Sequence, residues 1–361
     1  MTPQCAVCGE PVDVADRFCE ACGAPVVGVP PLEVAQEQEA VSSGAARGVP
    51  RCPACTADSS AAPPAVTADG YCESCGRKVP SGRDHEELNI GLVAGVTDRG
   101  LRHARNEDAM ALAVVTQAGD ARELASPSGP GWPTVIAVIS DGVSSTPRAD
   151  AASLAVVQAA VRVLRAEIGA RTHPADASVS AARVAGAALV AMTGADGTGP
   201  EGAPAATYAS AVVDGGAVTA CWLGDSRVYW LAADGSRCLT RDDSVAEELV
   251  ASSLASREEA MASQQSHVIT RWLGADLPDP EPHVVRFEPP APGAALVCSD
   301  GLWNYQPEAE ALAAMALPTA LTDPLAAAAA LVKFAVDSGG ADNITAAIVP
   351  FPPAHGPYPA A

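Results

Sequence analysis

Five short acidic motifs have the residue types and the placement to bind divalent cations. They are Asn106-Glu107-Asp108, Ser140-Asp141-Gly142, Gly224-Asp225-Ser226-Arg227, Ser299-Asp300-Gly301 and Ala341-Asp342-Asn343. Each lies beside a predicted strand end. A carboxylate buried there loses hydration, and a hydrogen bond or a cation must compensate the free-energy cost. One such motif is usually a simple turn, but several converging carboxylates would form the oxygen-rich cage that Mg²⁺ and Mn²⁺ prefer.

Four Cys-x-x-Cys pairs in the N-terminal part of the chain predict two structural zinc sites. They are Cys5/Cys8, Cys19/Cys22, Cys52/Cys55 and Cys72/Cys75. Two such pairs complete the tetrahedral thiolate shell that Zn²⁺ prefers, and a closed shell leaves no open position for catalysis. A glycine (Gly9, Gly23 or Gly76) follows three of the pairs, where a positive φ lets the backbone curl toward the sulfurs. We expect one zinc ribbon over residues 1–26 and a second over residues 48–82.

The segments around these cysteine pairs differ in composition. Residues 27–47 are rich in Glu, Gln, Gly, Ser and Pro, which is typical of a linker. A polar hinge over residues 80–87 precedes the main body. Residues 88–351 have the pattern of one folded domain, and residues 352–361 are expected to form a tail.

Hydrophobic patterns in the domain predict strand pairs that alternate with helix pairs. Apolar runs predict strands at 90–96, 109–115, 134–139, 207–213, 218–223, 228–232 and 344–349, with others around Val284 and Leu296. Helical spacing predicts helices at 154–168, 178–192 and 244–254, and two more before the last strand. This order differs from strict β-α-β alternation. We therefore expect an α+β fold of packed antiparallel sheets flanked by helices.

Taken in their order, the motifs resemble those of the metal-dependent protein phosphatases of type 2C. The similarity is carried by Asp98-Arg99-Gly100, Asn106-Glu107-Asp108, Ile139-Ser140-Asp141-Gly142, Gly224-Asp225-Ser226-Arg227, Cys298-Ser299-Asp300-Gly301 and Asp342-Asn343-Ile344-Thr345. It covers about residues 90–350. The resemblance implies the family's four-layer α/β/β/α sandwich, here preceded by the two zinc ribbons, and the activity of a protein serine/threonine phosphatase.

The resemblance also implies which residues bind two Mg²⁺ or Mn²⁺ ions: Glu107, Asp141, Gly142 through its carbonyl, Asp300 and Asp342. Asp141 would bridge both ions. Glu107 and Gly142 would serve one ion, and Asp300 and Asp342 would hold the other. A third ion is left open, with Glu201 as its candidate ligand.

Asp108 and His103 complete the candidate catalytic set with Asp141. By resemblance, Asp108 would orient a metal-bound water. This water would attack phosphorus in line with the leaving serine or threonine oxygen, without a phosphoenzyme. Asp225 and Arg227 would instead fix the turn between two strands.

The residue that grips phosphate departs from the family pattern. The family usually has arginine three residues before the Asn-Glu-Asp motif, where this chain has His103. His103 can grip phosphate only when it is protonated. Arg102 or Arg105 could take over, or this loop has no phosphate role. Val143 stands where some relatives have a histidine that protonates the leaving group, so water or His103 would have to supply that proton.

Composition restricts the partners. The 361-residue chain carries a formal net charge of −21, which disfavours nucleic acid as a partner. We expect no apolar leader and no apolar run long enough to cross a bilayer, hence no membrane insertion and a cytoplasmic location. Phosphorylated proteins, such as a Ser/Thr protein kinase or its substrates, are the expected partners.

Three functional hypotheses follow from these features. The first is an active phosphatase whose zinc ribbons dock a partner. The second is a phosphatase-like protein of low activity that binds phosphoproteins or scaffolds a kinase, which the departures at His103 and Val143 leave open. The third makes the ribbons a nucleic-acid module, but they carry few basic residues.

Overall fold

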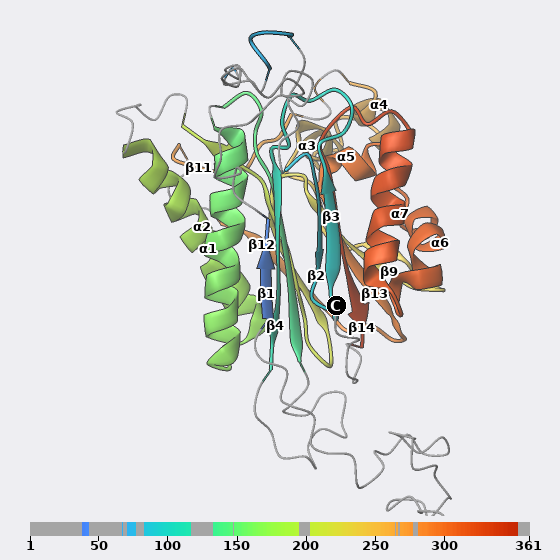
Figure 1. The fold of residues 1–361 in the computed structure, drawn as a ribbon. Coiled ribbons are helices and arrows are strands. Elements are labelled where there is room, and N and C mark those ends of the chain that lie inside the picture. The colour runs from blue at the N-terminus through green and yellow to red at the C-terminus, as the bar shows by residue number, and fades with distance from the viewer. Residues whose placement is uncertain are drawn as a thin grey trace, which may run out of the picture.

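The computed structural model describes residues 38–42, 67, 71–76, 83–116, 133–146, 148–194, 203–263, 265, 268–276 and 281–352. The described body contains two six-stranded sheets packed face to face, with a helix pair on each outer face (Figure 1). This agrees with the α+β class and the four layers expected from the sequence.

Neighbouring strands in all of these sheets run antiparallel. The first sheet contains, in spatial order, β1 (Gln38–Val41), β4 (Asp108–Val115), β5 (Thr134–Asp141), β7 (Tyr208–Val213), β8 (Val218–Leu223) and β12 (His283–Phe287). The second contains β10 (Arg237–Cys238), β9 (Arg227–Leu231), β13 (Gly293–Cys298), β14 (Ile344–Phe351), β3 (Ala94–Asp98) and β2 (His85–Asn89). A small third sheet pairs β6 (Ala205–Ala206) with β11 (Leu273–Gly274).

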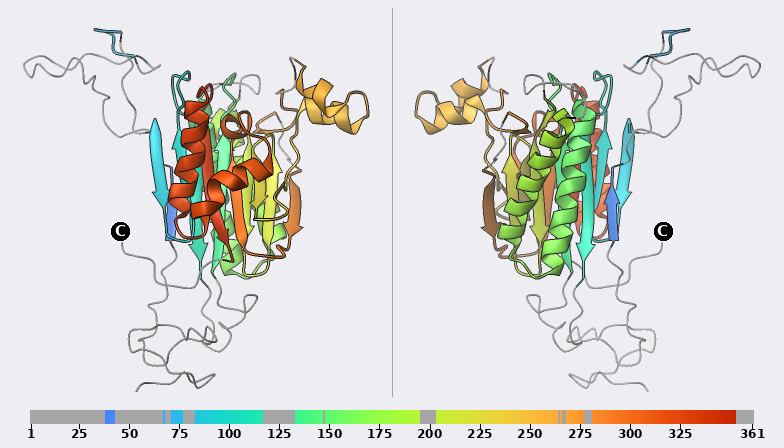
Figure 2. Two further views of the ribbon diagram at one scale, coloured as in Figure 1. Left: turned by 90° about the vertical axis from the view of Figure 1, so that its right-hand side faces the viewer. Right: turned by 90° about the vertical axis from the view of Figure 1, so that its left-hand side faces the viewer.

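The helices form the outer layers and one protruding segment. Helices α1 (Ala149–Gly169) and α2 (Pro174–Gly194) cover the first sheet. Helices α6 (Ala309–Ala320) and α7 (Pro324–Asp337) cover the second, and the short α5 (Asp300–Trp303) directly follows β13. Two further short helices, α3 (Val245–Ala251) and α4 (Arg257–Met261), project from one end of the body (Figure 2).

Strand β5 explains why the apolar runs in this sequence are continuous. Ile136 and Val138 pack against the α1–α2 pair, while Ala137 and Ile139 pack in the core between the two sheets. Successive side chains of a strand point to opposite faces. A strand that is covered on both faces must therefore be apolar throughout. The strand predicted at 134–139 is confirmed, and the helix predicted at 154–168 lies within α1.

Strand β1 corrects the predicted linker over residues 27–47. Gln38–Val41 pairs with β4, from Gln38 opposite Val114 to Val41 opposite Ala111. Ser42 extends the pairing, because its N–H donates to Met110 O and its Oγ accepts from Met110 N, both at 2.9 Å. The linker prediction is wrong for these residues because the edge of β4 supplies hydrogen-bond partners that a polar composition does not reveal.

The folded body also begins before residue 88, the predicted domain boundary. β2 pairs with β3 from His85 opposite Asp98 to Asn89 opposite Ala94. Its side chains alternate between exposed and half-buried, as expected of an edge strand, and this polar pattern led to the hinge prediction over residues 80–87. The strand predicted at 90–96 instead begins at Ala94, because Asn89 Oδ1 accepts from Gly91 N and turns the chain.

Helix α2 corrects the expectation that no segment is long and apolar enough to cross a bilayer. Its residues 174–193 have a mean hydropathy of 1.3, and α2 is the one candidate span among the described residues. The helix packs against α1 and β8, and several of its alanines are buried in that core: Ala177, Ala181, Ala182 and Ala185. Helix α2 thus covers the core with its alanine-rich face, while Val184 and Val190 on the helix are exposed.

Candidate active site

The carboxylates predicted to bind metal come together at one end of the two sheets. Strand register places Asp108, the first residue of β4, opposite Asp141, the last residue of β5. In the second sheet, the end of β13 lies beside the start of β14, so Asp300 and Asp342 follow and precede neighbouring strand ends. Hydrogen bonds from the second sheet reach Asp108, which shows that both pairs lie at the same end.

Asp108 is the buried centre of a hydrogen-bond network between the sheets. Its Oδ2 accepts from Ser299 Oγ at 2.7 Å and from Thr345 Oγ1 at 2.6 Å. Its Oδ1 is buried and has no hydrogen-bond partner among the described residues. Burial raises the pKa of Asp108 to about 6, although the two hydroxyl donors act in the opposite direction.

The neighbouring carboxylates repel one another. Loss of hydration, followed by the charges of Asp108 and Asp300, raises the pKa of Asp141 well above its usual value. Loss of hydration and the charge of Asp225 have the same effect on the pKa of Asp300. The Oδ1 atom of Asp300 is also buried, and none of the described residues forms a hydrogen bond with it. So much negative charge in a site with a low capacity for hydration calls for a compensating cation.

Two glycines allow the acidic segments to approach closely. A Cβ on Gly142 would lie 2.2 Å from Ala149 O, at the start of α1. A Cβ on Gly301 would lie 2.0 Å from Asn343 O, in the segment that carries Asp342. Any larger residue would push these backbones apart. The glycine in each Asp-Gly motif is therefore needed for the spacing of the site.

His103 is directed at a predicted metal ligand. Its Nε2 lies 3.1 Å from Asp342 Oδ1. Asp342 Oδ1 also accepts from Asn343 N at 2.8 Å. Asn343 stabilises the loop that carries His103, because its Nδ2 donates to the carbonyls of Arg99 and Arg105 on either side of His103.

The other predicted site residues lie around this centre. Glu107 Oε2 accepts from Ser144 Oγ at 2.5 Å, and its backbone carbonyl accepts from Gly142 N at 3.1 Å. Arg102 is exposed and Arg105 is half-buried, on the same loop as His103. Glu201, the candidate for a third ion, lies outside the described residues.

The contacts of Arg227 are consistent with the structural role predicted for it at a turn. Its guanidinium forms a bidentate pair with Asp242, at 2.8 and 2.7 Å, and lies 3.7 Å from the centroid of the Trp303 ring. Trp303 in turn donates from Nε1 to Asp225 O at 2.9 Å. These contacts stabilise the strand ends beside the carboxylates.

The oxygen-only donor set fits hard divalent cations such as Mg²⁺ and Mn²⁺. Among the described residues, no three His, Cys, Asp or Glu side chains already stand in the arrangement of an ion's ligands. The fit is carried instead by the buried oxygens of Asp108 and Asp300 that lack hydrogen-bond partners, and by the unbalanced charge around them. The ligand set expected from the sequence stays a prediction: Glu107, Asp141, Gly142, Asp300 and Asp342.

Sequence reasoning missed the polar residues that support these carboxylates. Ser299 and Thr345 lie in the quoted motifs, and hydroxyls next to otherwise apolar strands were the signal that could have identified them. Arg83 is buried beside Asp108 and gave no such signal, because it stands alone in a polar segment.

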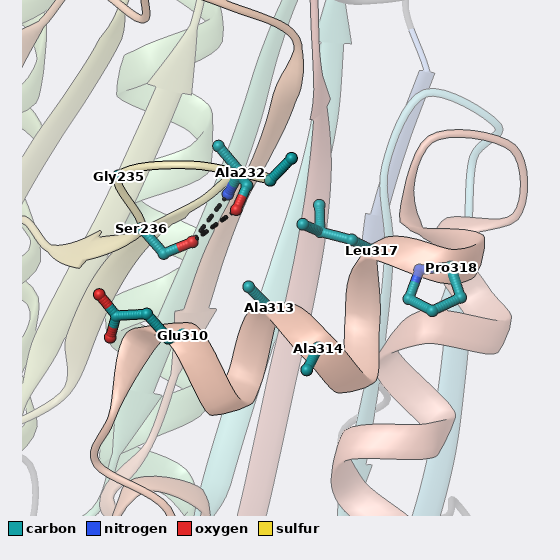
Figure 3. Close-up of a pocket in the computed structure, with 9 residues that line it drawn as sticks. Ala232, Gly235, Ser236, Glu310, Ala313, Ala314, Leu317 and Pro318 are labelled. Carbon is teal, nitrogen blue, oxygen red and sulfur yellow. Dashed lines mark hydrogen bonds between the residues drawn. The ribbon is translucent and has the colours of Figure 1, made fainter.

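A hollow of about 460 Å³ lies elsewhere, between the β9–β10 turn and α6 (Figure 3). It is lined mainly by small and apolar side chains, with Glu310 as its one charged residue. Ser236 closes the turn by donating to Ala232 O at 2.8 Å. None of the acidic motif residues lines this hollow, so it is separate from the candidate active site.

Of the predicted zinc ligands, Cys72 and Cys75 belong to the described residues. Cys72 is buried and Cys75 is exposed, on a tight turn in which Gly76 N donates to Cys72 O at 2.8 Å. Gly76 has φ of +66°, as expected from the sequence. The other predicted zinc ligands lie outside the described residues: Cys5, Cys8, Cys19, Cys22, Cys52 and Cys55.

Comparisons with known proteins agree with this fold. Among solved structures, the Mycobacterium tuberculosis serine/threonine phosphatase PstP/Ppp is similar to this chain, with a TM-score of 0.55 and 25% sequence identity. The match covers 71% of this chain and 96% of that one. The catalytic domain of the phosphatase PstP in complex with 2 manganese ions has a TM-score of 0.51 at 23% identity, over 71% of this chain and 96% of that one, and shares the fold.

Sequence comparison gives the family. The serine/threonine phosphatase stp of Listeria innocua is 33% identical over 144 residues, which are 40% of this chain and 55% of that protein. The chain thus spans about half the length of the curated relatives it matches first. The model of the family described as protein phosphatase 2C matches residues 120–334, more than half of the sequence. The chain belongs to the protein phosphatase 2C family.

Proposed function

We propose that this protein hydrolyses phosphoserine and phosphothreonine in other proteins, with two Mg²⁺ or Mn²⁺ ions in the acidic site. The observation that carries the proposal is the carboxylate cluster of buried Asp108 with half-buried Asp141 and Asp300, in which two buried oxygens have no hydrogen-bond partner among the described residues. Family membership supports the same reaction class. Glu107, Asp141, the Gly142 carbonyl, Asp300 and Asp342 would hold the ions.

The ions would supply Lewis acidity for the attack of water on phosphorus. Asp108 would orient that water. This role is supported by Ser299 and Thr345, which hold its Oδ2, and by its Oδ1, which has no hydrogen-bond partner among the described residues. The bond from phosphorus to the serine or threonine oxygen breaks as water attacks. The attacking water gives up one proton to solvent and the leaving oxygen takes up one from solvent water, because Val143 has none to give. No covalent phosphoenzyme is needed.

The phosphate-binding residues are proposed from the loop that carries His103. Arg102 and Arg105 are the cations on this loop that could meet the substrate phosphate. His103 could also contact phosphate, but its Nε2 is placed to hold Asp342. Its first role in this proposal is therefore to orient a metal-binding carboxylate.

We further propose that the four cysteine pairs hold two structural Zn²⁺ ions and that the resulting ribbons dock a partner, such as a Ser/Thr kinase or its substrate. The turn at Cys72–Cys75, with its positive φ at Gly76, supports the zinc assignment. Cysteine pairs stay reduced and free to bind zinc in the cytosol, so the zinc assignment goes with a proposed cytoplasmic location.

The contact between His103 and Asp342 also favours a second candidate function. A histidine committed to a carboxylate leaves the site without the arginine that the family usually places there. The protein could then bind phosphoproteins, or scaffold a kinase, with little turnover.

Turnover measurements separate the two functions. Mn²⁺-dependent hydrolysis of p-nitrophenyl phosphate and of a phosphothreonine peptide would be compared for the wild type, Asp141→Ala and the control Asp214→Ala, whose carboxylate pairs with Arg286 away from the site. We expect activity that Asp141→Ala abolishes and Asp214→Ala retains. Phosphopeptide binding with no Mn²⁺-dependent turnover would support the second function instead.

A further inference from the structure

Arg83 is a buried cation that the phosphatase motifs do not include. Its exposed fraction is 6%, although it precedes β2 in a segment of hinge-like composition. Its Nη2 donates to Asp108 O at 2.8 Å, and its Nη1 donates to Asp150 O at 3.0 Å. Arginine is rarely buried without a specific set of partners.

The two carbonyls that Arg83 binds belong to two different elements beside the candidate active site. Asp108 begins β4 and lies opposite Asp141 in the sheet. Asp150 lies in the first turn of α1, next to Ala149, whose carbonyl lies against Gly142. The guanidinium therefore connects the start of β4 to the helix that packs on the Asp141-Gly142 motif.

The backbone of Arg83 also contacts the Asn106-Glu107-Asp108 motif. Its carbonyl accepts from Asn106 Nδ2 at 3.0 Å, and this amide also donates to Thr97 Oγ1 at 2.8 Å. Asn106 Oδ1 in turn accepts from Asp108 N at 3.2 Å. The side chain and the main chain of Arg83 thus fix both ends of Asn106-Glu107-Asp108.

Placing an arginine here has a cost. Burial lowers the pKa of the Arg83 guanidinium, while the charges of Asp150, Glu86 and Asp108 act in the opposite direction. Arg83 donates to the backbone carbonyls of Asp108 and Asp150, so the carboxylate of Asp108 stays available. A planar group with donors in a fixed fork can set the distance between two backbones, which a flexible lysine does less well.

We propose that Arg83 is a positioning residue for the metal site, which holds the Glu107–Asp108 segment at a set distance from the Asp141-Gly142 motif and so determines metal affinity and turnover. The inference rests on the proposed function, because it deepens the role of the same site. It also makes the segment before the predicted domain boundary part of the catalytic machinery.

The test compares Arg83→Met and Arg83→Lys with Arg286→Met in the full chain. Arg286 is a matched control, since its guanidinium also makes two hydrogen bonds, to Thr219 Oγ1 at 3.1 Å and Asp214 Oδ2 at 2.9 Å, away from the carboxylates. Mn²⁺ affinity is measured by calorimetry. The values of kcat and KM are measured with p-nitrophenyl phosphate, and stability is measured by thermal melting.

For Arg83→Met we expect Mn²⁺ binding weaker by about 10–100-fold, the range seen when support of metal ligands is lost. The value of kcat should fall while KM changes by less than about twofold. Arg83→Lys should retain part of the affinity. Arg286→Met should lower the melting temperature and leave Mn²⁺ affinity unchanged.

Mn²⁺ affinity within twofold of wild type in both Arg83 variants, or an equal loss in Arg286→Met, would overturn the inference. If Arg83→Met does not fold, Arg83→Lys decides by the same criterion. A wild type that binds Mn²⁺ but does not hydrolyse phosphate refutes the proposed function alone, because the affinity ratios still decide the role of Arg83. A wild type that binds no Mn²⁺ refutes both.

Discussion

The imidazole Nε2 of His103 lies 3.1 Å from Oδ1 of Asp342, so the residue that replaces the family's arginine contacts a candidate metal ligand. The contact raises the question whether His103 binds the substrate phosphate, as the family's arginine does, or orients Asp342. If His103 mainly orients Asp342, phosphate binding is left to other groups and should be weak.

His103→Arg should therefore improve substrate binding. A guanidinium can form a charge-assisted bidentate contact with phosphate. We expect KM for p-nitrophenyl phosphate to fall by about threefold to tenfold, the effect of one ordinary net hydrogen bond of about 0.7–1.4 kcal/mol. His103→Gln, which keeps a donor for Asp342 but carries no charge, is the control and should leave KM unchanged or higher. A rise in KM in His103→Arg would show that His103 itself grips phosphate.

Thr345→Val should reduce turnover by removing one of the donors to Asp108. The change keeps the shape of the side chain but leaves Asp108 Oδ2 with Ser299 alone. Loss of a hydrogen bond to a buried charged group costs about 1.5–3 kcal/mol, and we expect kcat to fall by about tenfold. Thr193→Val is the control, since this exposed hydroxyl donates within α2 to Val190 O. Equal kcat values for the two variants would contradict the assigned network.

Gly301→Ala should damage both the fold and the metal site. The added Cβ would lie 2.0 Å from Asn343 O, so the segments that carry Asp300 and Asp342 must separate. We expect a loss of about 1–3 kcal/mol in the free energy of unfolding together with weaker Mn²⁺ binding by calorimetry. Gly169→Ala, at the end of α1, should be neutral or slightly stabilising, because outside the neighbouring helix backbone no atom of the described residues lies within 4 Å of the new Cβ. Retained Mn²⁺ affinity in Gly301→Ala would mean that the two aspartates do not share an ion.

The stability of the metal-free protein should fall as pH rises from about 4 to about 7. Burial, the largest cause, raises the pKa of Asp108 to about 6 and, with the charge of Asp242, that of Asp225 to about 7, against an ordinary value of 3.8. Between these values the native state binds more protons than the unfolded state, so the free energy of unfolding decreases with rising pH.

Thermal melts in a chelator at about pH 5 and about pH 7.5 would check this prediction. Added Mn²⁺ should raise the melting temperature more at the higher pH, because it binds the ionised carboxylates. Asp225→Asn should reduce the pH dependence in the metal-free state. A metal-free protein that becomes more stable between these two pH values would contradict the assigned burial of uncompensated charge.

The extent to which the sequence predicted this molecule follows from where each residue finds its partners. β5 was predictable because Ile136 and Val138 belong to a continuous apolar run, and α1 because Leu164 belongs to an apolar stripe at helical spacing. The convergence of Asp141 and Asp300 was predictable from the family motifs at strand ends. These signals are local, or are carried by the order of known motifs.

The unpredicted features depend on contacts between segments far apart in the sequence. Arg83 binds Asp108 O and Asp150 O, and nothing in its neighbouring residues indicates burial. The contact of His103 with Asp342 joins residues from near the two ends of the domain's sequence. β1 was hidden because its short polar sequence becomes a strand only beside β4.

The place of β1 has a practical meaning for work with this protein. A fragment trimmed to the phosphatase motifs would leave β4 with a bare row of amide and carbonyl groups, the kind of surface on which chains join sheet to sheet and precipitate. Expression clones that start at or before Gln38 keep that row covered, and the Glu39–Arg165 ion pair holds the covering strand against α1.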